Sequence, residues 1–259
     1  MHCTAVPPFI FDHDVTIANQ CVVVWCGCIS YAPALQLQLK ICDLKKRGYG
    51  KDVLLLLEHP SVITLGRSAE RKNLLVSVDY LKKCGVDLWE TDRGGDITYH
   101  GPGQLVGYPI LSLRAGERDV RNYMRRLEES LMRLLHGYGI ESNRENAFTG
   151  VWTEKGKIAA MGVHLSRWIT RHGFALNVHT DLSRFGLIVP CGISGRSVTS
   201  MEKELNRRHD LRAVAERYIH EFEFVFKRHI IRMDENKLRD DLEDYERKTG
   251  PVPGSAIPG

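Results

Sequence analysis

The apolar residues of this chain are grouped into many short runs, and this grouping limits the possible fold more than any other feature. The runs with the length and punctuation of β-strands are CVVVW, DVLLLLE, VITLG, QLVGYPIL, GVW, KIAAMGVHL and FALNV. Apolar residues at helical spacing predict three helices, over residues 31–47, 119–138 and 211–226. Because the helices stand apart from runs of consecutive strands, the pattern predicts an α+β fold and not a regular βαβ repeat.

The length and composition suit one folded domain. The chain has 259 residues, of which 43% are hydrophobic and 26% charged, enough for one sizeable core. We expect a loosely ordered arm over residues 1–20 and a folded domain over residues 21–232. Residues 233–259 are charged and then rich in Pro and Gly, which predicts a disordered tail.

Charge and hydropathy exclude several classes of protein. The net charge of +4 comes without long basic runs, so we expect no nucleic-acid partner. No apolar run approaches the roughly 20 residues of a membrane helix, so we expect no membrane partner. No Lys or Arg precedes Lys40, which argues against a secretory signal. We therefore expect a cytoplasmic protein whose seven cysteines are free thiols.

The stretch RGGDITYHGPGQLVGYPI, residues 93–110, brackets a short strand with glycines. Alternation along this strand puts Asp96, Thr98 and His100 on one face and Ile97 and Tyr99 on the other. Glycines at both ends allow the main chain to bend and to approach a ligand closely. The sequence thus predicts one polar strand face at the mouth of an apolar slot, with Asp96 solvated.

Two side chains are candidates for chemistry. Cys191 lies in the Gly-rich segment IVPCGISGRS, where it could hold a thioester carbonyl against backbone N–H groups. Alternatively, Cys191 is a small buried apolar residue. A hairpin through VWTEKGKIAAMGV would put Lys157 on an apolar strand face, where it needs a partner unless its stem reaches water. Cys21, Cys26 and Cys28 lack a convincing fourth ligand, so no metal is predicted.

Three blocks of the sequence resemble the signature blocks of one enzyme family. RGGDITYHGPGQLVGYPI, GKIAAMGVHLSRWITRHGFALNV and IVPCGISGRSVTSMEKEL are similar to those of the lipoate-biosynthesis octanoyltransferases. The blocks occur in the family's order, and the resemblance covers roughly residues 21–230. It implies the fold of the biotin and lipoate protein ligases, with mixed β-sheets flanked by helices, and makes residues 21–232 the catalytic domain.

The resemblance also implies a reaction and its residues. An octanoyl group would pass from octanoyl-acyl carrier protein to a cysteine, and from there to a lysine of a lipoyl domain, without a cofactor. By resemblance the nucleophile is Cys191 and its partner is Lys157. The implied acceptors are the lipoyl domains of 2-oxoacid dehydrogenase E2 subunits and the glycine cleavage H protein. The implied substrate-binding residues are Arg93, Gly94, Gly95, Asp96, Ile97, Thr98, Tyr99, His100, Ala160, Met161, Gly162, Gly173, Phe174 and Ala175.

Two other functions stay open at this point. An ATP-dependent lipoate or biotin ligase of the same fold would consume ATP and would not need Cys191. A non-catalytic scaffold that binds acyl carrier protein would form no covalent adduct. For the transferase, a hypothetical docking face for acidic carrier proteins comprises Arg67, Arg71, Lys72, Arg118, Arg121, Arg125 and Arg126. We expect a monomer.

Overall fold

In the computed structural model, the described residues, 19–145, 148–189 and 197–250, form two sheets with helices around them. The large sheet has the strand order β10-β1-β2-β6-β9-β8-β7 and the small one β4-β3-β5. The strands are β1 (Gln20–Cys28), β2 (Asp52–Glu58), β3 (Val62–Leu65), β4 (Asp87–Glu90), β5 (Ile97–His100), β6 (Gln104–Ile110), β7 (Val151–Thr153), β8 (Gly156–Ser166), β9 (Ile169–Asn177) and β10 (His229–Arg232). The helices are α1 (Tyr31–Lys46), α2 (Val78–Lys83), α3 (Val120–His136), α4 (Met201–Leu205), α5 (Leu211–Phe226) and α6 (Glu235–Thr249), with short 3-10 turns η2 (Arg71–Asn73), η3 (Ala115–Glu117) and η4 (Leu182–Leu187).

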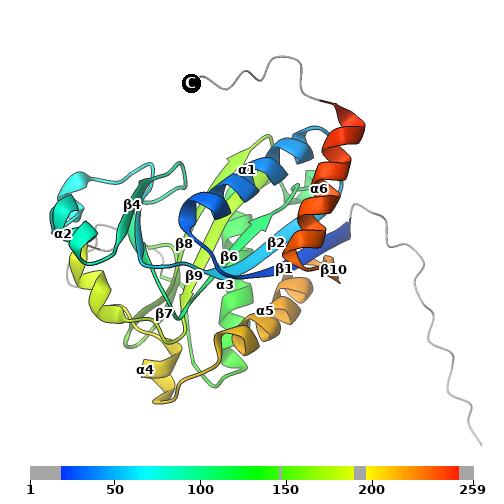
Figure 1. Ribbon diagram of the computed structural model, residues 1–259. Coiled ribbons are helices and arrows are strands. Elements are labelled where there is room, and N and C mark those ends of the chain that lie inside the picture. The colour runs from blue at the N-terminus through cyan, green and yellow to red at the C-terminus, as the bar shows by residue number, and fades with distance from the viewer. Residues whose placement is uncertain (1–18, 146–147, 190–196, 251–259) are drawn as a thin grey trace, which may run out of the picture.

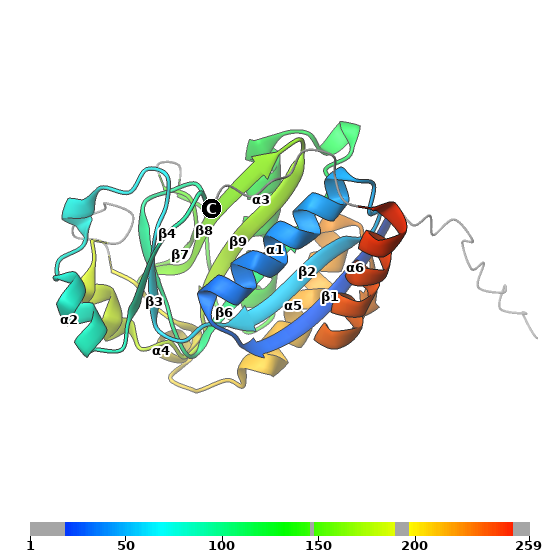
Figure 2. The same cartoon turned by 45° about the horizontal axis from the view of Figure 1, so that its top comes forward.

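The large sheet is covered on both faces, and this explains why its inner strands read as continuous apolar runs. Helices α1 and α6 lie on one face, and α3 and α5 lie on the other (Figures 1 and 2). Leu54 and Leu56 of β2 pack on the α3 and α5 side, whereas Leu55 and Leu57 pack on the α1 and α6 side. A strand buried on both faces needs apolar residues at every position. The predicted α+β class, strands and three helices are confirmed.

The small sheet makes a separate core beside the large one (Figure 2). Residues of β3 and β5 pack there with Leu81 of α2 and Phe185 of η4. Strand β5 runs antiparallel to β3, with Thr98 opposite Thr64. The two sheets thereby place the segment 93–100 beside β8 and β9, where the site lies. None of the helices in the described ranges is long and apolar enough to span a bilayer.

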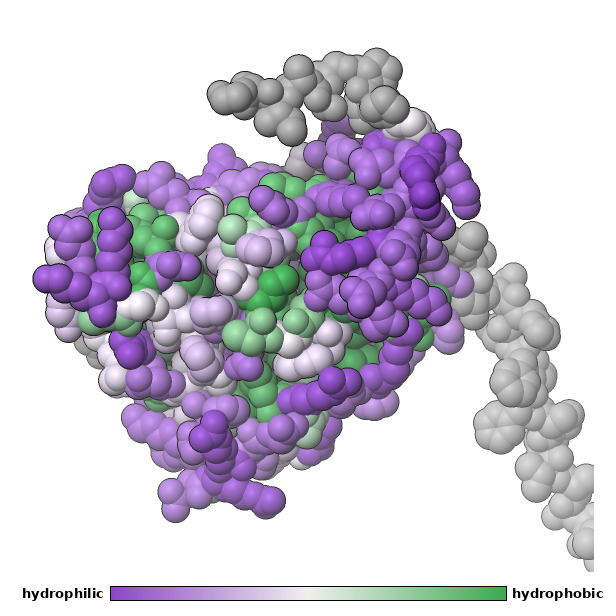
Figure 3. Space-filling model, viewed as in Figure 1, coloured by the Kyte–Doolittle hydropathy of each residue, from purple (hydrophilic) through white to green (hydrophobic). Residues whose placement is uncertain are grey.

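The prediction of a disordered tail from residue 233 is wrong for Glu235–Thr249, which form helix α6. Asp234 caps the helix by accepting from the Lys237 N–H at 2.8 Å. Leu238 and Leu242, one turn apart, are fully buried against the α1 side of the sheet. The outer surface of α6 is hydrophilic (Figure 3). A helix with only two buried leucines among many charges has the composition of a solvated tail, so composition alone does not predict the helix. Residues 1–18 and 251–259 lie outside the described residues.

We expect Leu238→Ala to lower the free energy of unfolding by about 2–5 kcal/mol, because it leaves a cavity under α6. The matched control is Glu243→Ala on the exposed side of the same helix, which should stay within about 0.5 kcal/mol of the parent. Urea unfolding followed by circular dichroism measures both. Equal stability of the two variants would show that α6 is not packed on the sheet in solution.

Candidate active site

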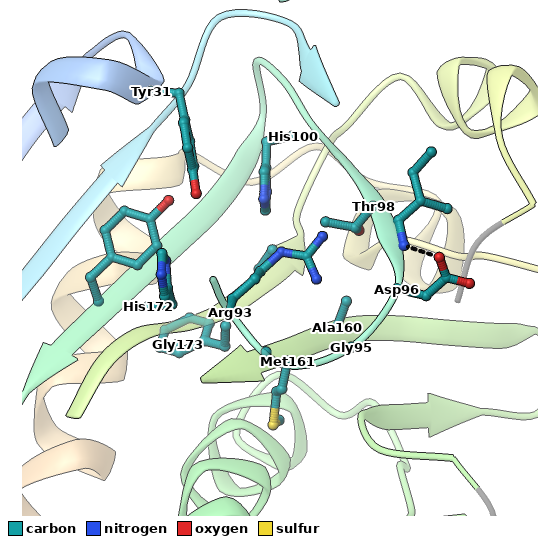
Figure 4. Close-up of a pocket in the computed structure, with 15 residues that line it drawn as sticks. Tyr31, Arg93, Gly95, Asp96, Thr98, His100, Ala160, Met161, His172 and Gly173 are labelled. Carbon is teal, nitrogen blue, oxygen red and sulfur yellow. Dashed lines mark hydrogen bonds between the residues drawn. The ribbon is translucent and has the colours of Figure 1, made fainter. Parts of the chain in front are cut away.

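A cavity of about 490 Å³, including the part open to solvent, lies between β5, β8 and β9 (Figure 4). Its walls are largely apolar or glycine, with a few polar groups aimed inward, as in small-molecule sites. The lining residues are Tyr31, Arg93, Gly95, Asp96, Ile97, Thr98, His100, Tyr108, Ala160, Met161, Gly162, His172, Gly173, Phe174 and Ala175. The segments predicted to bind substrate therefore meet around one space, although they are far apart in the sequence.

Two of the predicted substrate-binding residues do not line this cavity. Gly94 lines a second, more open cavity next to it. Tyr99 points the other way: its ring packs in the small-sheet core and its hydroxyl lies 3.0 Å from Ser61 Oγ. A substrate contact for Tyr99 stays a prediction, because the structure shows only that its side chain packs away from this cavity. Thr98 and His100 of the same strand do line the cavity.

Asp96 is a structural anchor and not a solvated carboxylate. Its Oδ1 accepts from the Ile97 N–H at 2.7 Å, as drawn in Figure 4, and its Oδ2 accepts from Asn73 Nδ2 at 2.5 Å. A third contact comes from the Glu70 N–H at 3.3 Å. These bonds tie the turn before β5 to η2. The expectation of solvation is corrected, because alternation alone could not reveal these partners.

The glycine segment before β5 lies directly against the edge of β8. The Gly94 N–H donates to Val163 O at 2.8 Å. A Cβ at Gly162 would lie 2.6 Å from Gly94 O, closer than real Cβ contacts allow. Only glycine therefore lets the two main chains meet at this point. Their contact closes one side of the cavity.

Arg93 carries a fixed positive charge into the cavity wall. Its Nη2 donates to Thr64 O at 2.6 Å and its Nε donates to Thr64 Oγ1 at 3.1 Å. The residue is 8% exposed. These bonds to the middle of the small sheet fix the guanidinium in one orientation.

The histidines around the cavity are neutral at pH 7. Burial lowers the pKa of His100 to about 3, and its Nδ1 lies 2.8 Å from Gln104 Oε1. Burial, helped by the charge of Arg171, lowers the pKa of His172 to about 3, and burial lowers that of His59 to about 4. A positive charge is disfavoured on each ring because little water reaches it. His100 and His172 therefore act as polar wall groups with fixed hydrogen bonds, and His59 lies against the wall residue Tyr108.

Sequence reasoning missed the residues that close one end of the cavity. Tyr31 comes from the first turn of α1, and its hydroxyl donates to Thr91 Oγ1 at 3.0 Å. The Tyr108 hydroxyl lies 2.7 Å from His59 Nε2. The Nε2 of His172 lies 2.9 Å from Asp92 Oδ1. No local pattern singles out these rings, because only the folding of α1 onto the sheet brings them together.

Lys157 lines the second, more open cavity. The predicted hairpin is confirmed, with β7 and β8 joined between Thr153 and Gly156. Lys157 is only 7% exposed, and its ammonium lies 4.7 Å from the centre of the Trp152 ring, a cation–π distance. A Cβ at Gly150 would lie 3.3 Å from Lys157 Cε, so the glycine makes room for the lysine stem. The aromatic partner of the lysine thus comes from the neighbouring strand β7, where Trp152 is paired with Lys157.

The two cavities adjoin. Both are lined by Gly95, Asp96, Met161 and Gly162. The four shared residues come from the glycine segment and from β8, which lie against each other between the two cavities.

Cys191 and Gly192 lie outside the described residues, and their roles stay predictions. The described flanks of that segment each bond to a residue that lines the open cavity. On one side, the Val189 N–H donates to Asn73 O at 2.7 Å. On the other, the Lys157 N–H donates to Ser197 O and the Thr199 N–H donates to Lys157 O, each at 3.0 Å. Asn73 and Lys157 are themselves lining residues of that cavity.

A chain of buried amides connects the slot to this second flank. Gln104 Nε2 donates to Asn177 Oδ1 at 2.9 Å, and Asn177 Nδ2 donates to Thr199 O at 2.9 Å. Gln104 also contacts His100, as described above. The three side chains link the slot wall to the segment that pairs with Lys157.

Comparison with known proteins identifies the family. Residues 30–223 match the lipoyl protein ligase A/B catalytic domain. An octanoyltransferase of Solibacter usitatus is 53% identical over 208 residues, 80% of this chain and 94% of the relative. One of Koribacter versatilis is 50% identical over 224 residues, 84% of this chain and 89% of the relative. The chain belongs to the octanoyltransferase family.

Solved structures confirm that this octanoyltransferase family member has the lipoate protein ligase fold. A bi-partite lipoate protein ligase of Thermoplasma acidophilum superposes with a TM-score of 0.69 at 17% identity, covering 90% of this chain and 94% of the ligase. A lipoate-protein ligase A bound with ATP gives a TM-score of 0.69 at 18% identity, covering 89% and 95%. At such low identity these likenesses establish the fold alone.

We expect Asn177→Ala to increase hydrogen exchange of the Thr199 amide by about tenfold or more. The change removes a donor to Thr199 O, and a loss of about 1.4 kcal/mol in local stability corresponds to tenfold faster exchange. The control is Asn236→Ala on the exposed surface of α6. Unchanged protection of Thr199 in Asn177→Ala would mean that the amide chain does not hold the segment beside Lys157.

Proposed function

We propose that this protein transfers an octanoyl group from octanoyl-acyl carrier protein to a lysine of lipoyl domains, through a thioester on Cys191 with Lys157 as its partner. The octanoyltransferase relatives support the reaction class. The observation that carries the proposal is the apolar slot that shares Met161 and Gly162 as lining residues with the cavity of Lys157. The acceptors we propose are the lipoyl domains of 2-oxoacid dehydrogenases and the glycine cleavage H protein.

The slot suits an unbranched acyl chain. Ile97, Ala160, Phe174 and Ala175 offer apolar contacts, and the glycines of β8 and β9 leave the space that larger side chains would fill. Each methylene buried there gains about 0.8 kcal/mol. The thioester would lie on the side of the slot where Met161 and Gly162 line both cavities. The methyl end of the chain would then lie on the other side, among the rings of Tyr31, Tyr108 and His172.

The position of the flanking segments supports Cys191 as the nucleophile. It is two residues from Val189, whose N–H bonds to Asn73 at the rim of the open cavity. An ammonium group nearby favours the thiolate form of a cysteine, which is the reactive form. Lys157, held over Trp152, is the ammonium group in question.

In the first step the Cys191 thiolate attacks the thioester carbonyl. A carbon–sulfur bond to the cysteine forms, the bond to the carrier thiol breaks, and the departing thiolate takes a proton from the Lys157 ammonium. In the second step the amine of the acceptor lysine attacks the new thioester. An amide bond forms, the Cys191 thiolate leaves, and neutral Lys157 takes the proton from the attacking amine. Neither step consumes ATP, because each exchanges one acyl bond for another.

Intact-protein mass spectrometry after mixing the protein with octanoyl-acyl carrier protein, without ATP, tests this proposal. We expect one octanoyl adduct that hydroxylamine removes and that disappears when a lipoyl domain gains the same mass. Cys191→Ala should form no adduct, and Lys157→Met should form it at least 100-fold more slowly, because general acid–base groups contribute about 10²–10⁴-fold. The matched control is Lys155→Met, whose lysine is exposed on the hairpin turn.

The two other functions give different results in the same experiment. A ligase would modify the lipoyl domain only when ATP and free octanoate are supplied, and Cys191→Ala would remain active. A scaffold would form no adduct under either condition. Equal rates of adduct formation for Lys157→Met and Lys155→Met would reject the role proposed for Lys157. They would not affect the assignment of Cys191 as the nucleophile.

A further inference from the structure

The first two turns of α3 border the open cavity, and this surface would meet any protein that presents an acyl group to it. Val120 and Met124 line that cavity together with Lys157. Val120 is 47% exposed, which is high for a large apolar side chain beside a cavity. The surface considered below comprises Val120, Arg121, Met124 and Arg125, and we call it the α3 rim.

Three members of the basic face suggested by the sequence are paired or turned inward in the structure. Arg71 is paired with Glu90, and Lys72 with Glu70. Arg126 is turned inward: its guanidinium bonds to Glu117 and Val225 O and lies 4.6 Å from the centre of the Phe226 ring. These side chains therefore stabilise the fold or are neutralised locally.

Arg121 and Arg125 lie one helical turn apart on the exposed side of α3. They line a polar hollow next to the open cavity, together with Arg144. Arg144 is paired with Glu128 and Glu129 at 3.0 and 2.7 Å. Within the described ranges, neither Arg121 nor Arg125 takes part in an ion pair. Two positive charges with an apolar neighbour thus face solvent at the entrance.

Resting on the proposed function, we propose that the α3 rim docks the acyl donor, an acidic carrier protein whose acyl arm is attached through a phosphodiester. Arginine presents donors in a planar fork that matches phosphate and carboxylate oxygens. The donor brings both kinds of anion to the entrance. The acceptor brings a lysine side chain, which is cationic and gains nothing from two arginines at the point of entry. Val120 supplies an apolar contact between these charges and the cavity.

The charge-reversal pair Arg121→Glu and Arg125→Glu tests this inference in steady-state kinetics. We expect kcat/KM for octanoyl-acyl carrier protein to fall about tenfold or more through KM, because opposite charges at a rim speed association. Octanoyl-pantetheine, which has neither phosphate nor protein, should react within about twofold of the parent rate. High salt should reduce the difference between parent and variant, since exposed charges are screened.

The matched control is Lys237→Glu with Lys248→Glu, which reverses two exposed charges on α6, on the opposite face of the large sheet from α3 (Figures 1 and 2). This control should leave KM for the carrier unchanged. The inference is overturned if the α3 variant keeps the parent KM for the carrier, loses activity with octanoyl-pantetheine to the same degree, or raises only KM for the lipoyl domain. Failure of the parent to transfer octanoyl at all would instead reject the proposed function.

Discussion

The main-chain contact between the glycine segment and β8 is the constraint on which the rest of the site depends. The bond from the Gly94 N–H to Val163 O joins the small sheet to the large one, and Gly162 permits the approach. If the segment moved away, the slot would lose the wall that it shares with the cavity of Lys157. The residues on either side of Gly94 hold the segment in place for this contact. Asp96 bonds to Asn73 after it, and Arg93 bonds to Thr64 before it.

The described cavity wall is largely apolar or glycine, and the histidines in and behind it are uncharged. His59, His100 and His172 are kept neutral mainly by burial, and their hydrogen bonds to Tyr108, Gln104 and Asp92 hold the rings in place. Rigid rings at the closed end give the slot a fixed length, whereas an apolar end of flexible side chains would adapt to many ligands. A slot that excludes water also protects a thioester from hydrolysis. The same packing therefore serves binding and chemistry in the proposed reaction.

The fold could be predicted from local patterns wherever burial is regular. The continuous apolar run of β2 and the apolar residues at helical spacing in α5 both predict the elements that the structure shows. Helix α6 was missed because Leu238 and Leu242 are its only buried residues among many charges. The strand face of Thr98 and His100 followed from alternation. Tyr31, Tyr108 and the aromatic partner of Lys157 could not be predicted, because each depends on which segments meet after folding. The role of Cys191 stays a prediction.

In the proposed complex the acyl chain fills the slot. Its methyl end lies at the rings of Tyr31, Tyr108 and His172, and its carbonyl lies on the side toward Lys157. Photo-crosslinking tests this placement directly, with an octanoyl-pantetheine analogue that carries a diazirine at the end of the chain. After irradiation and proteolysis, mass spectrometry should locate the label on Tyr31, Tyr108 or His172. Label on Val120, Met124 or Phe148 would put the chain in the open cavity and contradict the account.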